Sequence, residues 1–248
     1  MPAIKEERMR LAVNIDHFAT LREARRAKEP EPVLVALLAE QAGAEGIVCH
    51  LRGDRRHIKE RDLHLLRQTV KTKLNLEMAA TAEMLKVAGE VKPDVVSLVP
   101  ERPDELTTEG GLNVLNRRKA LAPLIQKLHK AGIKVSIFID ANKPQILAAA
   151  EIGITLIEIN TGPYAETKPG RPAIKVLEEI RQAAEFGLES GLEEVHAGHG
   201  LDYFNVEPIL GIPFISELSI GFSIVARSAV VGVGRAVEEM ARLLRKRA

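Results

Sequence analysis

Short apolar runs rich in β-branched residues alternate along this chain with longer amphipathic stretches. A nearly continuous apolar run is typical of a parallel strand that is covered on both faces. Glycines at 43, 132 and 153 stand a few residues before such runs, where they can supply the left-handed cap that ends a helix. The pattern predicts strands at residues 9–15, 46–50, 74–78, 94–99, 134–139, 155–159, 193–197 and 214–219.

The amphipathic stretches predict helices at residues 32–41, 62–71, 81–91, 118–130, 144–151 and 173–186. Strands alternating with helices favour one α/β domain over 1–248, a closed (β/α)8 TIM-type barrel. An open doubly wound sheet is the alternative, because periodicity does not distinguish a closed sheet from an open one. That fold usually has a glycine-rich turn after its first strand, whereas this chain reads NIDHFAT from Asn14.

Composition narrows the class of protein. Of 248 residues, 46% are hydrophobic, which is enough for a sizeable core. Lys and Arg number 35 against 34 Asp and Glu, so we expect neither nucleic acid nor a membrane surface as partner. The single Cys49 excludes an intrachain disulfide and fits a small core residue in a reducing compartment. Without a membrane-length apolar run or a secretory signal, the chain is expected to be cytoplasmic.

Polar and ionisable residues follow many of the apolar runs. In an α/β barrel these strand ends share one mouth, where substrates bind and react. Histidine and glutamate there can act as general acids and bases near neutral pH. Taken singly, each residue could equally be a core histidine or part of a structural ion pair, but their common placement favours an active site. The group is Asn14, Asp16, His17, His50, Arg52, Glu77, Glu158 and His199.

Two anion sites are predicted around the same mouth. Barrels often bind phosphate with the loops after the seventh and eighth strands, here 198–200 and 219–223. Arg52, with Arg55 or Arg56 and His57, can hold a second anion. Two sites suggest two phosphorylated substrates or one doubly phosphorylated substrate. The long connections 18–31 and 101–113 are candidates for lids or extra elements, and inert surface loops are the alternative.

Other barrel chemistries fit less well. A Schiff-base aldolase needs a lysine at a strand end, whereas Lys73 and Lys134 precede their strands and belong to the opposite end. A metal enzyme could use His17, His50, Asp140 and His199, but none of these has the tight spacing of a ligand pair, and no metal is expected. A metal-dependent phosphosugar lyase or isomerase and a non-enzymatic phosphosugar-binding protein remain the alternatives.

Seven motifs, in order along the chain, resemble the pyridoxine 5′-phosphate synthase family. They are VNIDHFATLR (13–22), HLRGDRRHI (50–58), NLEMA (75–79), LVPE (98–101), TTEGG (107–111), IEINTG (157–162) and AGHGL (197–201). The resemblance implies a barrel with additional helices, assembled into octamers. It implies condensation of 1-deoxy-D-xylulose 5-phosphate with 3-amino-2-oxopropyl phosphate to pyridoxine 5′-phosphate, inorganic phosphate and water, without a redox cofactor.

The resemblance also assigns roles to residues of this chain. His50 and Glu77 would accept protons, His199 would donate one, and Glu158 would support the transition state. The aminoketone phosphate would be held by Asn14, Arg22, Gly200, Gly221 and Phe222. The deoxyxylulose phosphate would be held by Asp16, His17, Arg52, His57 and Thr107.

Two positions depart from the family pattern. Phe222 stands where the family often has His, so only its backbone N–H is expected to serve a phosphate. His196 stands where the family often has Asn, and a structural role is expected for it.

Overall fold

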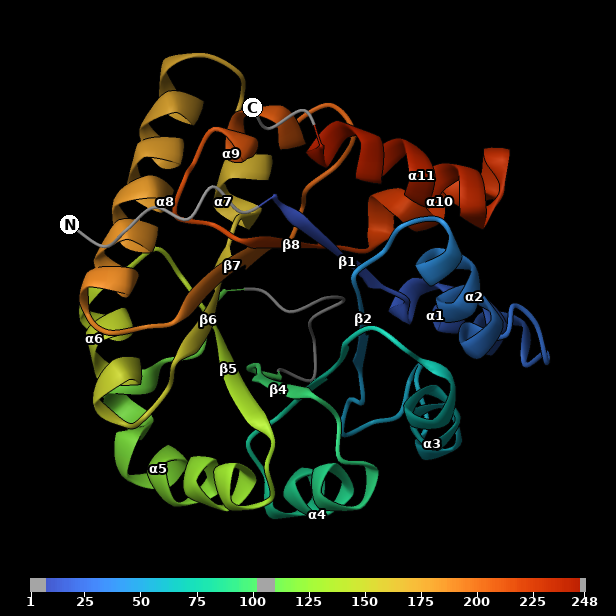
Figure 1. The fold of residues 1–248 in the computed structure, drawn as a ribbon, viewed down its shortest axis with the longest axis horizontal. Coiled ribbons are helices and arrows are strands. Elements are labelled where there is room, and N and C mark those ends of the chain that lie inside the picture. The colour runs from blue at the N-terminus through green and yellow to red at the C-terminus, as the bar shows by residue number, and fades with distance from the viewer. Residues whose placement is uncertain (1–7, 102–109, 246–248) are drawn as a thin grey trace.

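Eight parallel strands pair in sequence order, and the eighth pairs with the first, so the sheet is a closed barrel (Figure 1). The computed structural model describes residues 8–101 and 110–245. All eight predicted strands are present, and closure decides against the open doubly wound sheet. The strands are β1 (Arg10–Asn14), β2 (Gly46–His50), β3 (Leu74–Met78), β4 (Val95–Leu98), β5 (Lys134–Ile139), β6 (Leu156–Asn160), β7 (Glu194–Gly198) and β8 (Glu217–Ile220).

Helices surround the barrel, as Figure 1 shows. The six predicted ones are α2 (Pro32–Gln41), α3 (Glu60–Thr69), α4 (Ala82–Val91), α5 (Val114–Lys130), α6 (Lys143–Glu151) and α8 (Arg171–Glu189). The additional helices are α1 (Asp16–Arg25), α7 (Gly162–Ala165), α9 (Val206–Leu210), α10 (Phe222–Val231) and α11 (Val233–Leu244). Among the described residues, no helix has the length and apolar character needed to cross a membrane.

The connection 18–31 is largely a helix rather than a long loop, because α1 extends to Arg25. Its buried positions are Asp16, Phe18, Ala19 and Arg22, so two of the four inward residues are charged. A helix usually shows its buried face as an apolar stripe. Here the stripe is interrupted by residues that serve the barrel mouth, which is why periodicity missed it.

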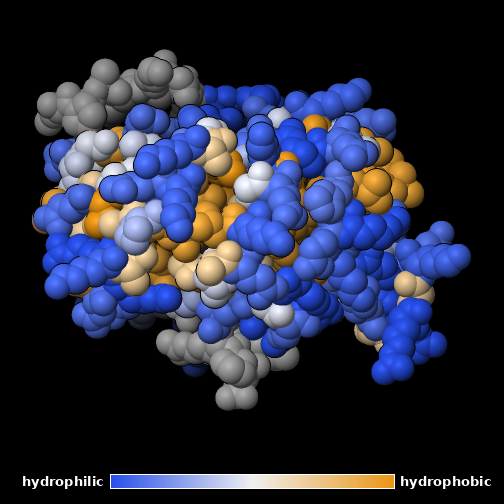
Figure 2. Space-filling view, turned by 90° about the horizontal axis from the view of Figure 1, so that it is seen from below, coloured by the Kyte–Doolittle hydropathy of each residue, from blue (hydrophilic) through white to orange (hydrophobic). Residues whose placement is uncertain are grey.

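The hydrophobic core lies between the barrel and the helices. Alternate strand residues point outward into it, including Leu11, Ile47, Cys49 and Ile157, each at most 1% exposed. Cys49 is therefore a core residue, as predicted, and burial raises the pKa of its thiol. Figure 2 shows one side of the molecule, where hydrophilic residues cover most of the surface and hydrophobic residues are visible between them.

The inside of the barrel contains several polar and charged residues. Buried polar and charged residues occupy inward positions of several strands: Asn75, Ser97, Ser136, Glu158, His196 and Glu217. Near the strand starts, Glu217 accepts hydrogen bonds from Lys73 and Arg10. Lys73 is thus at the end away from the mouth, as predicted. His196 lies 3.5 Å (Nδ1) from a Glu217 carboxylate oxygen, and its Nε2 lies 3.1 Å from Glu194, which supports its predicted structural role.

Candidate active site

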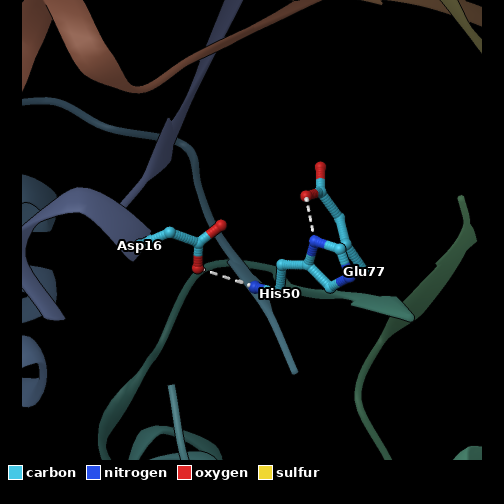
Figure 3. A group of neighbouring side chains, drawn as sticks. All are labelled: Asp16, His50 and Glu77. Atoms are coloured by element: carbon cyan, nitrogen blue, oxygen red, sulfur yellow. Dashed lines mark hydrogen bonds and ion pairs between the residues drawn. The ribbon is translucent and has the colours of Figure 1, made fainter. Parts of the chain in front are cut away.

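Three predicted site residues from the first three strands meet at the mouth. Asp16 follows β1, His50 ends β2 and Glu77 lies in β3. The Asp16 Oδ1 accepts the His50 backbone N–H at 2.7 Å, and His50 Nδ1 lies 4.0 Å from Glu77 Oε2 (Figure 3). One potential ligand atom from each residue lies within 4.8 Å of the others, so the group has the spacing of a metal site. Asp16, however, already accepts a hydrogen bond on each oxygen, the second from Asn14 at 3.0 Å.

A fourth member of this group, Glu101, was missed by the sequence analysis, which placed it only in a connecting loop. Its Oε1 lies 2.9 Å from His50 Nε2, and its Oε2 accepts the Gly53 backbone N–H at 3.0 Å. Burial acts to raise the pKa of Glu101, but the His50 contact, the Gly53 N–H and Arg52 hold it below its usual range. His50 therefore lies between two carboxyl groups. The available signal was the LVPE motif, which puts Glu101 just after β4.

Two carboxyl groups near the mouth, the half-buried Glu77 and the buried Glu158, favour their protonated forms. Burial raises the pKa of Glu77 well above its usual range, and the charges of Glu158 and Asp16 add to the effect. Burial and the charge of Glu217 raise the pKa of Glu158 to about 8, although Lys73 opposes them. Gly198 makes room for Glu158, because a Cβ there would lie 2.2 Å from Glu158 Oε1. Glu158 can therefore hold a proton near neutral pH.

His199 follows β7 in an unusual backbone conformation. Its φ of 82° lies in the left-handed region, which non-glycine residues rarely adopt. The Thr161 Oγ1 lies 2.6 Å from the His199 carbonyl oxygen and 2.7 Å from the Gly198 carbonyl oxygen. Gly162 leaves room for the imidazole, because a Cβ there would lie 2.8 Å from its Cδ2. Strained residues of this kind concentrate at functional sites.

The loop after β8 leads directly into α10. Gly221 is the N-cap of α10 and lies close to Asn14. A Cβ added at Gly221 would lie 3.1 Å from the Cβ of Asn14. The free N–H groups at a helix start suit an anion. Phe222 is 70% exposed, and its ring meets the edge of His17 with 5.5 Å between the ring centroids. Gly200, after His199, has a φ of 73° and is exposed.

Arg52 and His57 form the other predicted anion group, on the connection between β2 and α3. Both are buried, and Arg52 Nε lies 3.7 Å from Asp54. His57 Nδ1 accepts the Ile58 N–H at 2.9 Å, which leaves Nε2 as the donor of the neutral ring. Burial lowers the pKa of His57, although Asp16 opposes this. The neutral ring is thus favoured.

Arg22 lies behind this group. Its guanidinium donates to both Asp62 oxygens, at 2.9 and 2.7 Å, and to the His57 carbonyl oxygen at 3.1 Å. In this arrangement it supports His57, and its role as a phosphate ligand stays a prediction. Asp140, a candidate metal ligand in the sequence, accepts hydrogen bonds from Gly111 and Asn160. Thr107, and most of the 101–113 connection, lie outside the described residues.

Residues 11–246 match the family described as pyridoxal phosphate biosynthesis protein PdxJ. The chain belongs to this family. It is 54% identical over 230 residues to the pyridoxine 5′-phosphate synthase of a Synechococcus strain, covering 93% of this chain and 96% of that protein. It is 53% identical over 236 residues to the protein of the same name from Chlorobium luteolum, covering 95% and 100%.

Solved structures share the fold of this PdxJ family member at low sequence identity. A phosphoribosylanthranilate isomerase from Thermotoga maritima has a TM-score of 0.59 at 12% identity, covering 95% of this chain and 98% of that one. A 4-hydroxy-2-oxoglutarate aldolase structure has a TM-score of 0.61 at 14% identity, covering 96% and 95%. At these identities the likeness shows the barrel fold alone.

Proposed function

We propose that this PdxJ family member condenses 1-deoxy-D-xylulose 5-phosphate with 3-amino-2-oxopropyl phosphate to form pyridoxine 5′-phosphate, inorganic phosphate and water. The observation that carries the proposal is the acid–base group around His50, in a chain 54% identical to a pyridoxine 5′-phosphate synthase over almost its whole length. Imidazole and carboxyl groups with different environments are what a sequence of proton transfers needs.

The reaction begins when the substrate amine attacks the ketone of its partner. Loss of water then gives an imine that joins the two substrates, so no enzyme lysine is needed. Lys73 is bound to Glu217 at the other end of the barrel, which agrees with this route. Phosphate loss, ring closure and a further dehydration complete the ring.

Four residues are assigned to the proton transfers. His50 accepts a proton from the condensing carbon skeleton, and His199 donates a proton to a leaving oxygen. Glu77 also accepts a proton, once it has released its own; its raised pKa makes the resulting carboxylate a stronger base. Glu158, whose pKa is about 8, stays protonated and donates a hydrogen bond to charge that develops on oxygen. His50 ends β2, Glu77 is the next-to-last residue of β3, His199 follows β7, and Glu158 is the middle residue of β6.

Two groups of residues are assigned to the two phosphates. The aminoketone phosphate binds at the start of α10, through the backbone of Gly221 and Phe222, with Asn14, Gly200 and Arg22. The exposure of the Phe222 side chain supports a backbone contact at this position. The deoxyxylulose phosphate binds through Arg52, His57, His17, Asp16 and Thr107. Buried Arg52 and the Nε2 donor of His57 support this assignment.

The cellular and assembly state is part of the proposal. We propose that the protein works in the cytoplasm, and that it forms a homo-octamer, as its family resemblance implies. Light scattering coupled to size-exclusion chromatography measures the mass directly. An octamer of 27.2 kDa chains is expected, and a stable monomer would contradict this assignment.

The function is tested with purified protein and both substrates. Pyridoxine 5′-phosphate is followed by chromatography, and phosphate release is measured in parallel. Product is expected, and activity is expected to survive treatment with a chelator. Absence of product under conditions where a known synthase turns over would refute the function. Loss after chelation would favour a metal-dependent phosphosugar enzyme, and binding without turnover a phosphosugar-binding protein.

A further inference from the structure

We propose that Glu101 is a positioning residue that holds the imidazole of His50 in one tautomer, with the ring hydrogen on Nε2 and the free Nδ1 facing Glu77 and the substrates. The proposal rests on the proposed function only where it calls His50 a base. It adds a residue to the reaction that the strand-end pattern did not reveal.

The contacts around His50 are different on the two sides of its ring. On one side, Nε2 is 2.9 Å from Glu101 Oε1, which is a hydrogen bond. On the other side, Nδ1 is 4.0 Å from Glu77 Oε2, which is too long for one. The ring is 5% exposed, so water has little access to compete for either nitrogen. Glu101 therefore decides where the ring hydrogen lies.

Tautomer choice matters because a neutral imidazole has one donor and one acceptor nitrogen. A carboxylate that accepts the hydrogen on one nitrogen leaves the other free to take a proton, the arrangement of a catalytic triad. In His50, a hydrogen held on Nε2 leaves Nδ1 as the acceptor. The groups that also face this region are Asp16 on α1, Arg52 and His57 on the β2–α3 connection, and Glu77 on β3.

The second carboxylate oxygen of Glu101 determines how a glutamine would be oriented at this position. Oε2 accepts the Gly53 backbone N–H at 3.0 Å, so that position needs an acceptor. In Glu101→Gln the amide oxygen is expected to take the Gly53 contact, which turns the amide NH₂ toward His50. His50 Nε2 must then accept, and its hydrogen moves to Nδ1. The substitution keeps the size of the side chain but reverses the tautomer.

The experiment compares wild type, Glu101→Gln, Glu101→Asp and a control, Glu83→Gln. Glu83 is exposed and pairs with Arg55 on the β2–α3 connection without contacting His50. Ring ¹⁵N chemical shifts of labelled histidine, assigned with a His50→Gln variant, report the tautomer without substrates. Steady-state kinetics report kcat and KM for both substrates, and circular dichroism reports folding.

We expect the His50 hydrogen on Nε2 in wild type and on Nδ1 in Glu101→Gln. The kcat of Glu101→Gln should fall by about 100-fold or more, toward the roughly 10⁴-fold loss that the wrong tautomer causes in a catalytic triad, with a much smaller change in KM. Glu101→Asp should retain the wild-type tautomer and recover part of kcat. Glu83→Gln should match wild type. An unchanged tautomer in Glu101→Gln overturns the proposal, whether or not kcat falls, and so does a normal kcat.

The two proposals fail in different ways. If wild type makes no pyridoxine 5′-phosphate, the proposed function fails, while the ¹⁵N shifts still decide whether Glu101 sets the tautomer of His50. If wild type is active and the tautomer of Glu101→Gln is unchanged, only the role of Glu101 fails.

Discussion

Because Glu158 is protonated in the folded protein, we expect the free energy of unfolding to change with pH by an amount that can be calculated. Its pKa is raised from 4.5 to about 8, first by burial and then by the charge of Glu217. Each unit of pKa difference between folded and unfolded states corresponds to about 1.4 kcal/mol. As the pH rises from 4.5 to about 8, this one group therefore lowers the free energy of unfolding by roughly 5 kcal/mol.

The sign follows from proton binding. Between pH 4.5 and about 8 the folded chain keeps the Glu158 proton while the unfolded chain has lost it. Stability from this group is fully present below pH 4.5 and is lost as the pH rises through about 8. Glu158→Gln keeps a neutral side chain at every pH and removes this loss. The variant should therefore gain stability relative to wild type as the pH rises.

The assay is urea unfolding followed by circular dichroism, at a fixed protein concentration and several pH values. Between pH 6 and 7.5 the difference in unfolding free energy between Glu158→Gln and wild type should grow by roughly 2 kcal/mol in favour of the variant. Glu90→Gln, at an exposed position paired with Lys86, is the control and should show a small change throughout. If the difference in unfolding free energy between Glu158→Gln and wild type does not change with pH, Glu158 is not a buried carboxyl that stays protonated in the folded protein.

Further predictions concern the mouth and the barrel interior. Glu77→Gln and His199→Asn should each fold normally and lower kcat by about 100-fold or more in the synthase assay, the usual range for a positioned acid or base; near-normal turnover would remove that residue from its role. Gly198→Ala should displace the Glu158 carboxyl, because the new Cβ would lie 2.2 Å from its Oε1. Turnover should fall, with urea unfolding measured in parallel as a control for folding; normal turnover would contradict this. Lys73→Met should lower the unfolding free energy by about 2 kcal/mol, within the range for a hydrogen bond to a charged group, because Lys73 is 23% exposed and Glu217 keeps Arg10 and His196; unchanged urea midpoints would contradict the importance of its contact with Glu217.

The barrel could be predicted from the sequence because its evidence is local. Each strand is a short apolar run that packs against helices, and each predicted run forms a strand in the structure. Polar residues at strand ends also remain visible in a sequence, so His50, Glu77 and Glu158 could be proposed as neighbours. Parallel strands place their carboxyl ends at one mouth, and no further information is needed for that step.

The partners of those residues could not be predicted in the same way. Glu101 contacts His50, and Arg22 of α1 contacts Asp62 of α3, although these pairs are 51 and 40 positions apart in the sequence. A pattern of apolar and polar residues gives no direction to a loop side chain. In α1 the inward positions of Asp16 and Arg22 even removed the apolar periodicity by which the helix would have been found.

The polar interior connects fold and chemistry. A buried carboxyl group prefers to be neutral, and a buried ion pair keeps its charge only with close partners. Burial acts to raise the pKa of Glu217, but His196, Lys73 and Arg10 hold it below its usual range, so it stays charged. Glu158 is aligned with His196 across β6 and β7. The negative charge of Glu217 raises the pKa of Glu158. Burial and the charge of Glu217, partly opposed by Lys73, thus favour a proton on Glu158.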